Sequence, residues 1–526
     1  MNLKNKCQSI NIYSKIYYFV HSSFFIKSIF LTSFLSLTYM LIFIMPEINS
    51  QTVSTIHNDI NIFIILITFF SLSFLIAVIS VLAGIGGGIL FTPLMMAFSN
   101  IDSTLIRGTG LIVAMFSGLI STGPFMRSGL ANFRLTLLLA STFGVGAIFG
   151  SNISIALSSE FGFFGEALIR FLLSLLLFGL SIYFIVGVKK IEWPESRESC
   201  LLTKLLSLRL PYHEKTINKV VSYHINNTLL GISSILVVGF ISGFFGLGGG
   251  WAIVPIQNLI MSVPLKVACA NSGVLIGMGD SIAIWPYIRE GAIIPLFVTP
   301  WMVGQVFGGI IGAKYLSDIK AKNIRYILIG IMLFTSFSLA MKSFILFKII
   351  GNFHWTIYLL VFLSIFVSVF LLYKKSERKV ETVTSSHIFE EDLRPLIHKS
   401  QLVYGNIVYY LTGLSAIFSL IFLILAFLSQ KMSFFEQKSI IYKIFIGVKL
   451  NEIWNNFSLF NEGFSILFKL DLWTIALTVL GCLSPALALV FSVFHLIKEK
   501  SFVFSLLSLW IIFLIALSAT GILTFH

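Results

Sequence analysis

Charge is scarce in this sequence, and that scarcity sets the class of protein. Only 11% of the 526 residues are Asp, Glu, Lys or Arg, 57% are hydrophobic, and mean hydropathy is +0.95. Because so few polar side chains cannot cover a soluble globule, the composition predicts a multi-pass helical membrane protein embedded in a lipid bilayer. Several stretches reach the roughly 20 apolar residues that cross a bilayer. They are 61–83, 166–188, 326–346, 354–372, 403–428 and 502–525.

Cysteine is also rare, and the four cysteines lie far apart without a C-x-x-C motif or a Cys/His cluster. This spacing predicts neither a disulfide framework nor a metal site. No Ser/His/Asp set, carboxylate pair or redox cofactor motif stands out, so we expect no enzymatic activity and no cofactor. The net charge of +14 does not indicate nucleic acid, because the basic residues fall mainly in short loops between apolar segments.

Glycine, by contrast, is concentrated in two clusters inside apolar runs. They are Gly84-Ile85-Gly86-Gly87-Gly88, with Pro93 five residues on, and Gly246-Leu247-Gly248-Gly249-Gly250, with Pro255 at the same distance. Neither cluster is followed by the Gly-Lys-Ser/Thr of a nucleotide-binding loop. Glycine is a poor helix former, so each cluster predicts a break in a membrane helix. Matched breaks in two halves of a membrane protein are typical of a transporter's binding site.

The two clusters belong to an internal repeat with an offset of 162 residues. Without a gap, this offset pairs Ser80 with Ser242, Pro124 with Pro286, Arg127 with Arg289, Gly129 with Gly291, Gly146 with Gly308 and Gly150 with Gly312. Each copy is predicted to hold five apolar elements. These are 60–83, 88–99, 105–126, 135–157 and 166–188 in the first copy, and 228–245, 250–261, 268–287, 293–312 and 326–346 in the second.

The short elements 88–99 and 250–261 span about half the hydrocarbon core, so they read as half-helices or re-entrant arms. Loop charge predicts the orientation. The linker 189–220 has seven basic residues and should be cytoplasmic, whereas 46–60 has no Lys or Arg and should lie outside. Each copy then has an odd number of passes, and the second copy should be inverted relative to the first. Arg289, Lys342 and Lys348 oppose this count.

The chain divides into six predicted regions. They are an N-terminal helix and loop (1–58), in which 28–45 is a retained helix, the first transporter repeat (59–190), a cytoplasmic linker (191–225), the second repeat (226–346), an extra helix with a basic linker (347–402) and a C-terminal membrane extension without a readable motif (403–526).

The repeated glycine clusters, the small polar openings Arg107-Gly108-Thr109-Gly110 and Cys269-Ala270-Asn271-Ser272-Gly273, and the glycines after the basic loops (Gly129, Gly291) together resemble the TauE/SafE sulfite exporter family of the toluene-sulfonate uptake permease group. The resemblance covers about 60–346. It implies a secondary carrier of sulfite, sulfonates or related sulfur-containing or organic anions, coupled to an ion gradient, in the bacterial cytoplasmic (inner) membrane.

Backbone N–H groups at the start of a half-helix lack partners and carry the positive end of the helix dipole, so they can hold an anion. The alternative is that the glycines only permit close helix crossing. The expected substrate-binding residues are the glycines of both clusters together with Ser80, Ser242, Thr109, Asn271 and Ser272. Arg107 is expected either to attract the anion or only to flank its helix. Gln305, Gln257 and Asn258 are weaker candidates.

Asp280 lies inside a predicted helix, and an intramembrane acid predicts a coupling-proton site, unless it pairs with Arg289. Pro93, Pro255, Gly129 and Gly291 are expected to be structural. We therefore predict a permease for small anions that works by alternating access. Two alternatives stay open: a membrane anchoring or sensing protein built on a transporter-like core, and a carrier of a non-anionic solute. The sequence predicts no oligomeric state.

Overall fold

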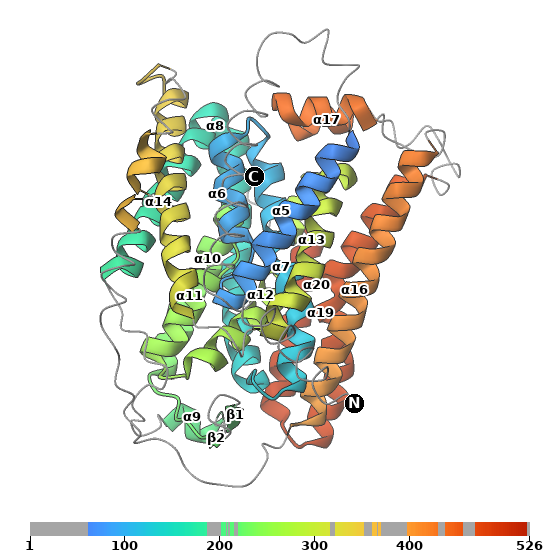
Figure 1. The fold of residues 1–526 in the computed structure, drawn as a ribbon. Coiled ribbons are helices and arrows are strands. Elements are labelled where there is room, and N and C mark those ends of the chain that lie inside the picture. Colours follow the sequence, from blue (N-terminus) through green and yellow to red (C-terminus); the bar gives the residue numbers. More distant parts are fainter. Residues whose placement is uncertain are drawn as a thin grey trace, which may run out of the picture. The chain divides into compact units, whose positions relative to one another are not determined.

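A computed structural model describes residues 62–186, 201–206, 208, 211–214, 219–315, 321–351, 360–365, 367–369, 397–429, 437–455 and 469–522 of the chain. Region 1–58, with its expected helix at 28–45, lies outside the described residues, as do 374–396 of the predicted basic linker. The described part is helical apart from one short hairpin (Figure 1).

The first repeat begins with the broken helix that the glycine cluster predicts. Helix α5 (Ile62–Ala83) ends just before the cluster, the short α6 (Gly88–Phe98) starts inside it, and α7 (Ser103–Arg127) follows. Helix α8 (Phe133–Val186) covers the last two elements predicted for this repeat, 135–157 and 166–188. Its two helical halves meet at a kink at Gly162 (φ 50, ψ −123), inside the predicted gap, so the prediction of two helices is confirmed, although they are joined directly and not by an open loop.

The linker between the repeats contains helix α9 (Leu201–Leu205) and an antiparallel hairpin of β1 (Tyr212–Glu214) and β2 (Lys219–Val221), in which Tyr212 pairs with Val221. The second repeat repeats the pattern of the first. Its elements are α10 (Thr228–Phe245), α11 (Gly250–Pro255), a π-helical turn (Ile256–Ile260), α12 (Leu265–Arg289), α13 (Pro295–Tyr315) and α14 (Ala321–Leu346).

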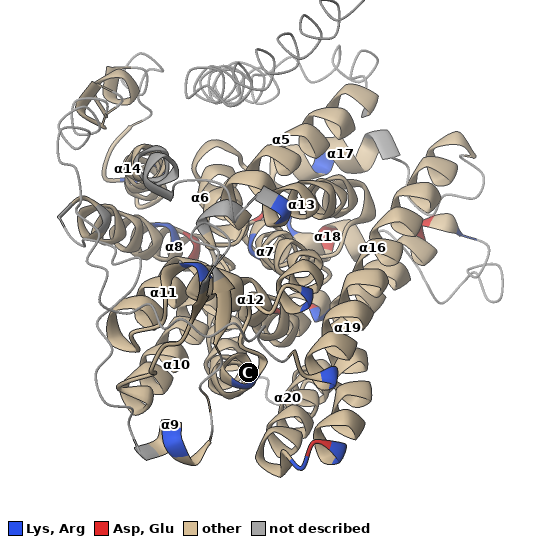
Figure 2. Cartoon of the chain, turned by 60° about the horizontal axis from the view of Figure 1, so that its bottom comes forward, with Lys and Arg blue, Asp and Glu red and all other residues tan. Residues whose placement is uncertain are grey.

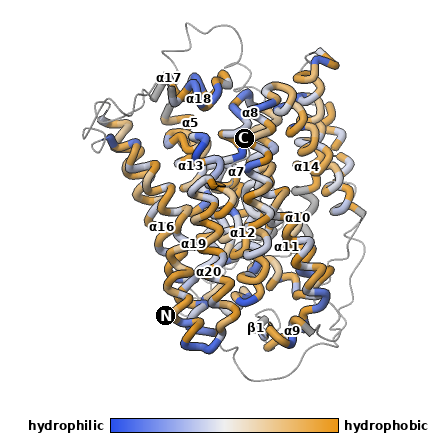
Figure 3. Tube along the Cα trace, turned by 180° about the vertical axis from the view of Figure 1, so that it is seen from behind, coloured by the Kyte–Doolittle hydropathy of each residue, from blue (hydrophilic) through white to orange (hydrophobic). Residues whose placement is uncertain are grey.

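The C-terminal extension contributes three long helices and two short ones. The long helices are α16 (Lys399–Leu428), α19 (Leu470–Lys498) and α20 (Phe502–Thr520), and the short ones are α17 (Gln437–Ile446) and α18 (Leu450–Asn455). Within the described residues, ten helices are long and apolar enough to cross a membrane. Charged residues are sparse along these helices in Figure 2, and α16, α19 and α20 are largely hydrophobic in Figure 3.

Helices pair mainly across the repeats rather than within them. The most extensive packing in the described fold joins α8 to α10 and α13 to α5, which is one pairing seen twice at the 162-residue offset. Glycine allows the close approach on both sides. A Cβ on Gly146 would lie 2.1 Å from the carbonyl oxygen of Leu236, and a Cβ on Gly308 would lie 2.4 Å from that of Phe74. Subtracting 162 turns Leu236 into Phe74 and Gly308 into Gly146, so the contacts are reciprocal.

Helices α7 and α12 form the centre of the core, since 94% of the apolar window of each is buried. The broken helices of the two copies, α5–α6 and α10–α11, begin at different ends of α7 and α12. Gly447 and Trp454 contact the loops that follow α6 and α12, at Asn100 and Gly291, and Phe69 in the first half of α5 packs against Phe445 of α17. The start of α10 instead lies with the β-hairpin linker and the loop before α12, where the N–H of Asn226 donates to Met261.

Candidate functional site

The two glycine breaks cross each other at the centre of the repeats. A Cβ on Gly88 would lie 2.5 Å from the carbonyl oxygen of Leu247, and a Cβ on Gly250 would lie 2.2 Å from that of Ile85. These contacts exchange when 162 is added or subtracted. Both neighbouring turns also meet the same two side chains, because Gly86 and Gly248 each lie beside Ala114 and Ile276. The breaks therefore form one junction, and every residue of it is buried.

Each break also contacts the first turns of a long helix of the other copy: the first break contacts α12 and the second contacts α7. Gly84 (φ +68) abuts Cys269 of α12, where a Cβ would lie 2.8 Å from Cα. Gly246 (φ +66) abuts Arg107 of α7, with a Cβ 2.4 Å from its carbonyl oxygen. Both glycines combine a left-handed φ with backbone contact, so no other residue type fits there without strain.

Several backbone N–H groups of the junction have no acceptor among the described residues. In the second break these are the N–H groups of Gly248, Gly249, Gly250 and Trp251, and in the first break they include those of Gly88 and Ile89. The first helical bonds begin only at Leu90 and Ala252, whose N–H groups donate to Gly87 and Gly249. Buried donors without partners are rare, and at the start of a half-helix they favour an anionic ligand.

The matched serines Ser80 and Ser242 differ in their partners. The hydroxyl of Ser242 donates to Oδ1 of Asp280 at 3.1 Å, and Oδ2 of Asp280 has no hydrogen-bond partner although the side chain is fully buried. The residue that matches Asp280 in the first copy is Gly118, since 280 minus 162 is 118. The Ser80 hydroxyl accordingly bonds the carbonyl of Ala77 in its own helix, at 3.2 Å. Only the second break carries an acid.

The three remaining polar candidates are buried, and two are already bonded. Thr109 donates to the Leu105 carbonyl in its own helix at 2.7 Å. Asn271 accepts from the N–H of Asn132 at 2.6 Å and donates to Oε1 of Gln257 at 2.9 Å, so it ties α12 to the loop before α8. The Ser272 hydroxyl has no partner. Thr109 and Asn271 therefore have fewer free hydrogen-bonding groups for a substrate than their positions in the sequence predict.

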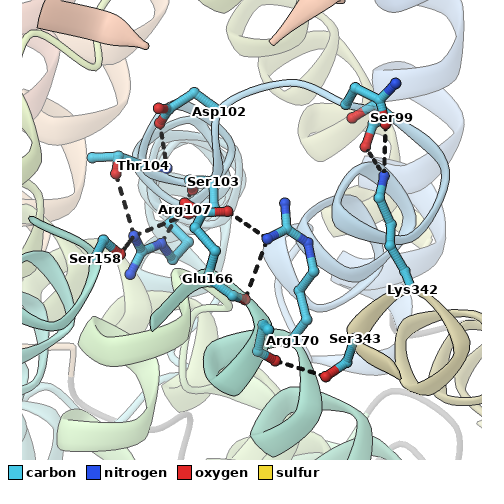
Figure 4. Close-up of polar contacts among 12 residues, drawn as sticks. Ser99, Asp102, Ser103, Thr104, Arg107, Ser158, Glu166, Arg170, Lys342 and Ser343 are labelled. Carbon is cyan, nitrogen blue, oxygen red and sulfur yellow. Dashed lines mark hydrogen bonds and ion pairs between the residues drawn. The ribbon is translucent and has the colours of Figure 1, made fainter. Parts of the chain in front are cut away.

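Arg107 is fully buried, and its guanidinium is surrounded by oxygen atoms of the protein (Figure 4). It donates to both oxygens of Ser154, to the carbonyl of Ser103 at 3.1 Å and to the hydroxyl of Ser158 at 2.7 Å. The Ser154 hydroxyl in turn caps the Phe244 carbonyl, at the end of α10. Arg107 thus stabilises the negative end of the broken helix, and its twin Cys269 places no charge at the other break.

A cluster of charged side chains beside Arg107 was not predicted. Glu166 of α8 forms an ion pair with Arg170 and accepts the hydroxyl of Ser103, while Lys342 of α14 reaches the Ser99 carbonyl (Figure 4). Asp102 caps α7, and burial followed by the nearby Glu166 raises the pKa of its carboxyl. The sequence signal was available, because Glu166 and Arg170 lie four residues apart in an apolar run. Glu166 is therefore a further acid, besides Asp280, inside the described helices of the repeats.

The structural candidates lie at matched places. Pro93 and Pro255 fall inside α6 and α11, and Gly129 (φ +67) and Gly291 (φ +77) follow the ends of α7 and α12. In both closing turns the glycine N–H donates three residues back, to Met126 and to Ile288. Arg289 bonds the Ser518 carbonyl and Asn152 instead of Asp280.

The part of the chain that the structure describes has ten apolar spans and two crossing helix breaks, which define a polytopic protein of the membrane transporter class. The chain belongs to the sulfite exporter TauE/SafE family, whose model matches residues 69–339, just over half of the sequence. A second family model, whose description names no function, matches 400–522.

The curated relatives align with 46% of this chain. The chain is 26% identical over 250 residues to the probable membrane transporter protein YunE of Bacillus subtilis, covering 85% of that protein. It is 24% identical over 243 residues to a probable membrane transporter protein of Xylella fastidiosa, covering 81% of it. No solved structure matches.

Proposed function

We propose that this protein is a secondary carrier of small anions, of the sulfite, sulfonate or related sulfur-containing or organic class, that works by alternating access at the crossing glycine breaks. The observation that carries the proposal is the junction itself, where unpartnered N–H groups from both breaks gather in a buried place. The family supports the anion class. Transport of this kind requires no enzymatic reaction. The bacterial cytoplasmic membrane is the proposed location.

We infer that the two copies lie inverted in the membrane. Reciprocal contacts at the 162-residue offset require a two-fold relation between the copies, and α5 and α10 start at different ends of the described fold. Such a pair can rock around a fixed central site. Arg289 and Lys342, which oppose the charge count, both donate to carbonyl oxygens of neighbouring elements, so neither is a free loop charge.

Asp280 is the proposed site of a coupling proton. Its carboxyl lies beside Gly248, where a Cβ would come within 3.1 Å of Oδ2, and among the described residues its only hydrogen-bond partner is the hydroxyl of Ser242. Asp280 has no basic partner among the described residues, and an acid inside a membrane helix that faces a binding site is a candidate proton carrier, which would exchange its proton when the site opens to water. Proton binding and substrate binding would then occur at the same junction.

A substrate panel tests the function. The full chain, purified and reconstituted in proteoliposomes, should take up labelled sulfite or a small sulfonate in a saturable way, and unlabelled members of the same class should compete. Flux of a cation or neutral solute that sulfite and sulfonates do not inhibit would instead support the non-anionic carrier. An imposed pH gradient tests the coupling in the same vesicles.

The extension remains a candidate for an anchoring or sensing role, because a separate family model matches it. It packs directly on the core. A Cβ on Gly123 of α7 would lie 2.7 Å from Tyr409, and Ser518 donates to the Ile282 carbonyl of α12 at 2.8 Å. Flux that persists after truncation behind residue 373 would remove the need for this role in transport. An intact protein that transports nothing in the panel but binds a partner would favour it.

A further inference from the structure

The two breaks are equivalent in the sequence repeat, but different side chains face them. A Cβ on Gly87 would lie 2.6 Å from Oε1 of Gln305, whereas a Cβ on the matching Gly249 would lie 2.4 Å from Cε2 of Phe143. Gln305 and Phe143 are themselves twins, since 143 plus 162 is 305. The first break therefore meets a carboxamide oxygen, and the second meets a phenyl ring.

The orientation of the Gln305 carboxamide follows from its partners. Nε2 donates to the carbonyl of Ser73 at 3.0 Å and to the Ser73 hydroxyl at 2.9 Å. That hydroxyl uses its own proton on the Trp301 carbonyl, at 2.5 Å. The group that faces Ser73 must then be a donor, so Oε1 faces Gly87. The positions that match Ser73 and Trp301 hold Ile235 and Leu139, neither of which has a polar side chain, so the second break has no counterpart of the Gln305–Ser73 hydrogen bonds.

The Oε1 atom of Gln305, which the hydrogen bonds to Ser73 hold towards Gly87, is an acceptor without a donor among the described residues. Gln305 is fully buried, and its Oε1 has no hydrogen-bond partner. It lies at the start of the 11-residue helix α6, where the N–H groups of Gly88 and Ile89 are unpartnered as well. The first break therefore combines donors for anionic oxygens with one fixed acceptor, while Phe143 fills the matching place at the second break.

We propose that Gln305 determines substrate specificity, and that the first break binds a small oxyanion that carries its own hydrogen-bond donor, such as a hydroxyl group. The N–H groups of α6 take the charged oxygens, and Oε1 of Gln305 accepts the donor. This inference rests on the proposed anion transport. It follows because a buried acceptor that a ligand leaves unpaired penalises binding, so an analogue without the donor is rejected.

The test compares hydroxyethanesulfonate with propanesulfonate, in which a methyl group replaces the hydroxyl. With the full-length wild type in proteoliposomes, the KM for hydroxyethanesulfonate should be lower by about tenfold or more. Gln305→Met, which keeps the length of the side chain but removes the acceptor, should bring the two KM values together. The matched variant Phe143→Leu, at the twin position, should leave their ratio as in the wild type.

A second variant guards against misfolding of Gln305→Met. Ser73→Ala keeps the acceptor but removes the hydroxyl, one of the two oxygens that hold the carboxamide, so the ratio should fall to a value between those of the wild type and Gln305→Met. Equal KM values in the wild type, or an unchanged ratio in both Gln305→Met and Ser73→Ala, would overturn the inference while leaving anion transport intact. A wild type that transports neither sulfonate nor sulfite would instead remove the proposed function, and the inference with it.

Discussion

Adding one methyl group at the crossing of the breaks should push them apart. In Gly88→Ala the new Cβ would lie 2.5 Å from the Leu247 oxygen, and in Gly250→Ala it would lie 2.2 Å from the Ile85 oxygen. A comfortable C···O contact is about 3.3 Å, so the backbones must separate by about 0.8 and 1.1 Å. Neither oxygen can rotate away, because both belong to the backbone. Overpacking of this kind destabilises a fold by about 1–3 kcal/mol for each variant.

The double variant tests whether the two clashes belong to one crossing. Once one methyl group has separated the breaks, the second meets less resistance, so the combined loss should be smaller than the sum of the single losses. The measurement is the free energy of unfolding in detergent micelles. Gly179→Ala is the control, since a Cβ there meets nothing within 4 Å and should cause no loss. Strict additivity, or wild-type stability in both single variants, would refute the crossing.

Two further variants probe the buried charges. Asp280→Asn keeps Oδ1 as an acceptor for Ser242 but cannot bind a proton, so substrate exchange should continue while uptake no longer responds to a pH gradient; uptake that still follows the gradient would rule out the coupling role. Glu166→Gln leaves Arg170 without its acid and should lower the free energy of unfolding by about 1–3 kcal/mol. Adding Arg170→Met should restore part of that loss, and no change in thermal unfolding of the single variant would contradict the pairing.

The sequence predicted the repeat well because glycine and proline mark backbone geometry directly. The breaks, the half-helices and the closing turns at Gly129 and Gly291 all depend on backbone conformation, so the same glycines and prolines recur in both copies at the 162-residue offset. The contacts between copies were not predictable, since nothing in the linear order shows that α5 pairs with α13.

Side chains that break the symmetry were harder to interpret from sequence. Phe143 looks like an ordinary core residue until it is seen against Gly249, and Gln305 was only a weak candidate because its partner Ser73 lies in another helix. The sequence did not decide whether Arg107 attracts the anion or only flanks its helix. The oxygen atoms that surround its guanidinium come from several segments and are brought together only by the fold. The two halves of α8 were predicted as separate helices, but the sequence around Gly162 does not show that a kink joins them without an open loop.

The central claim is that substrate passes through the junction of the two breaks, and the most direct measurement is anion flux with one break filled. Gly87→Leu drives a side chain towards Gln305 and Val113, where a Cβ alone would already lie 2.6 and 2.9 Å from them. Reconstituted at equal density and shown to insert normally, this variant should carry no sulfite or sulfonate, while Gly179→Leu keeps saturable flux. Wild-type flux through Gly87→Leu would contradict the account.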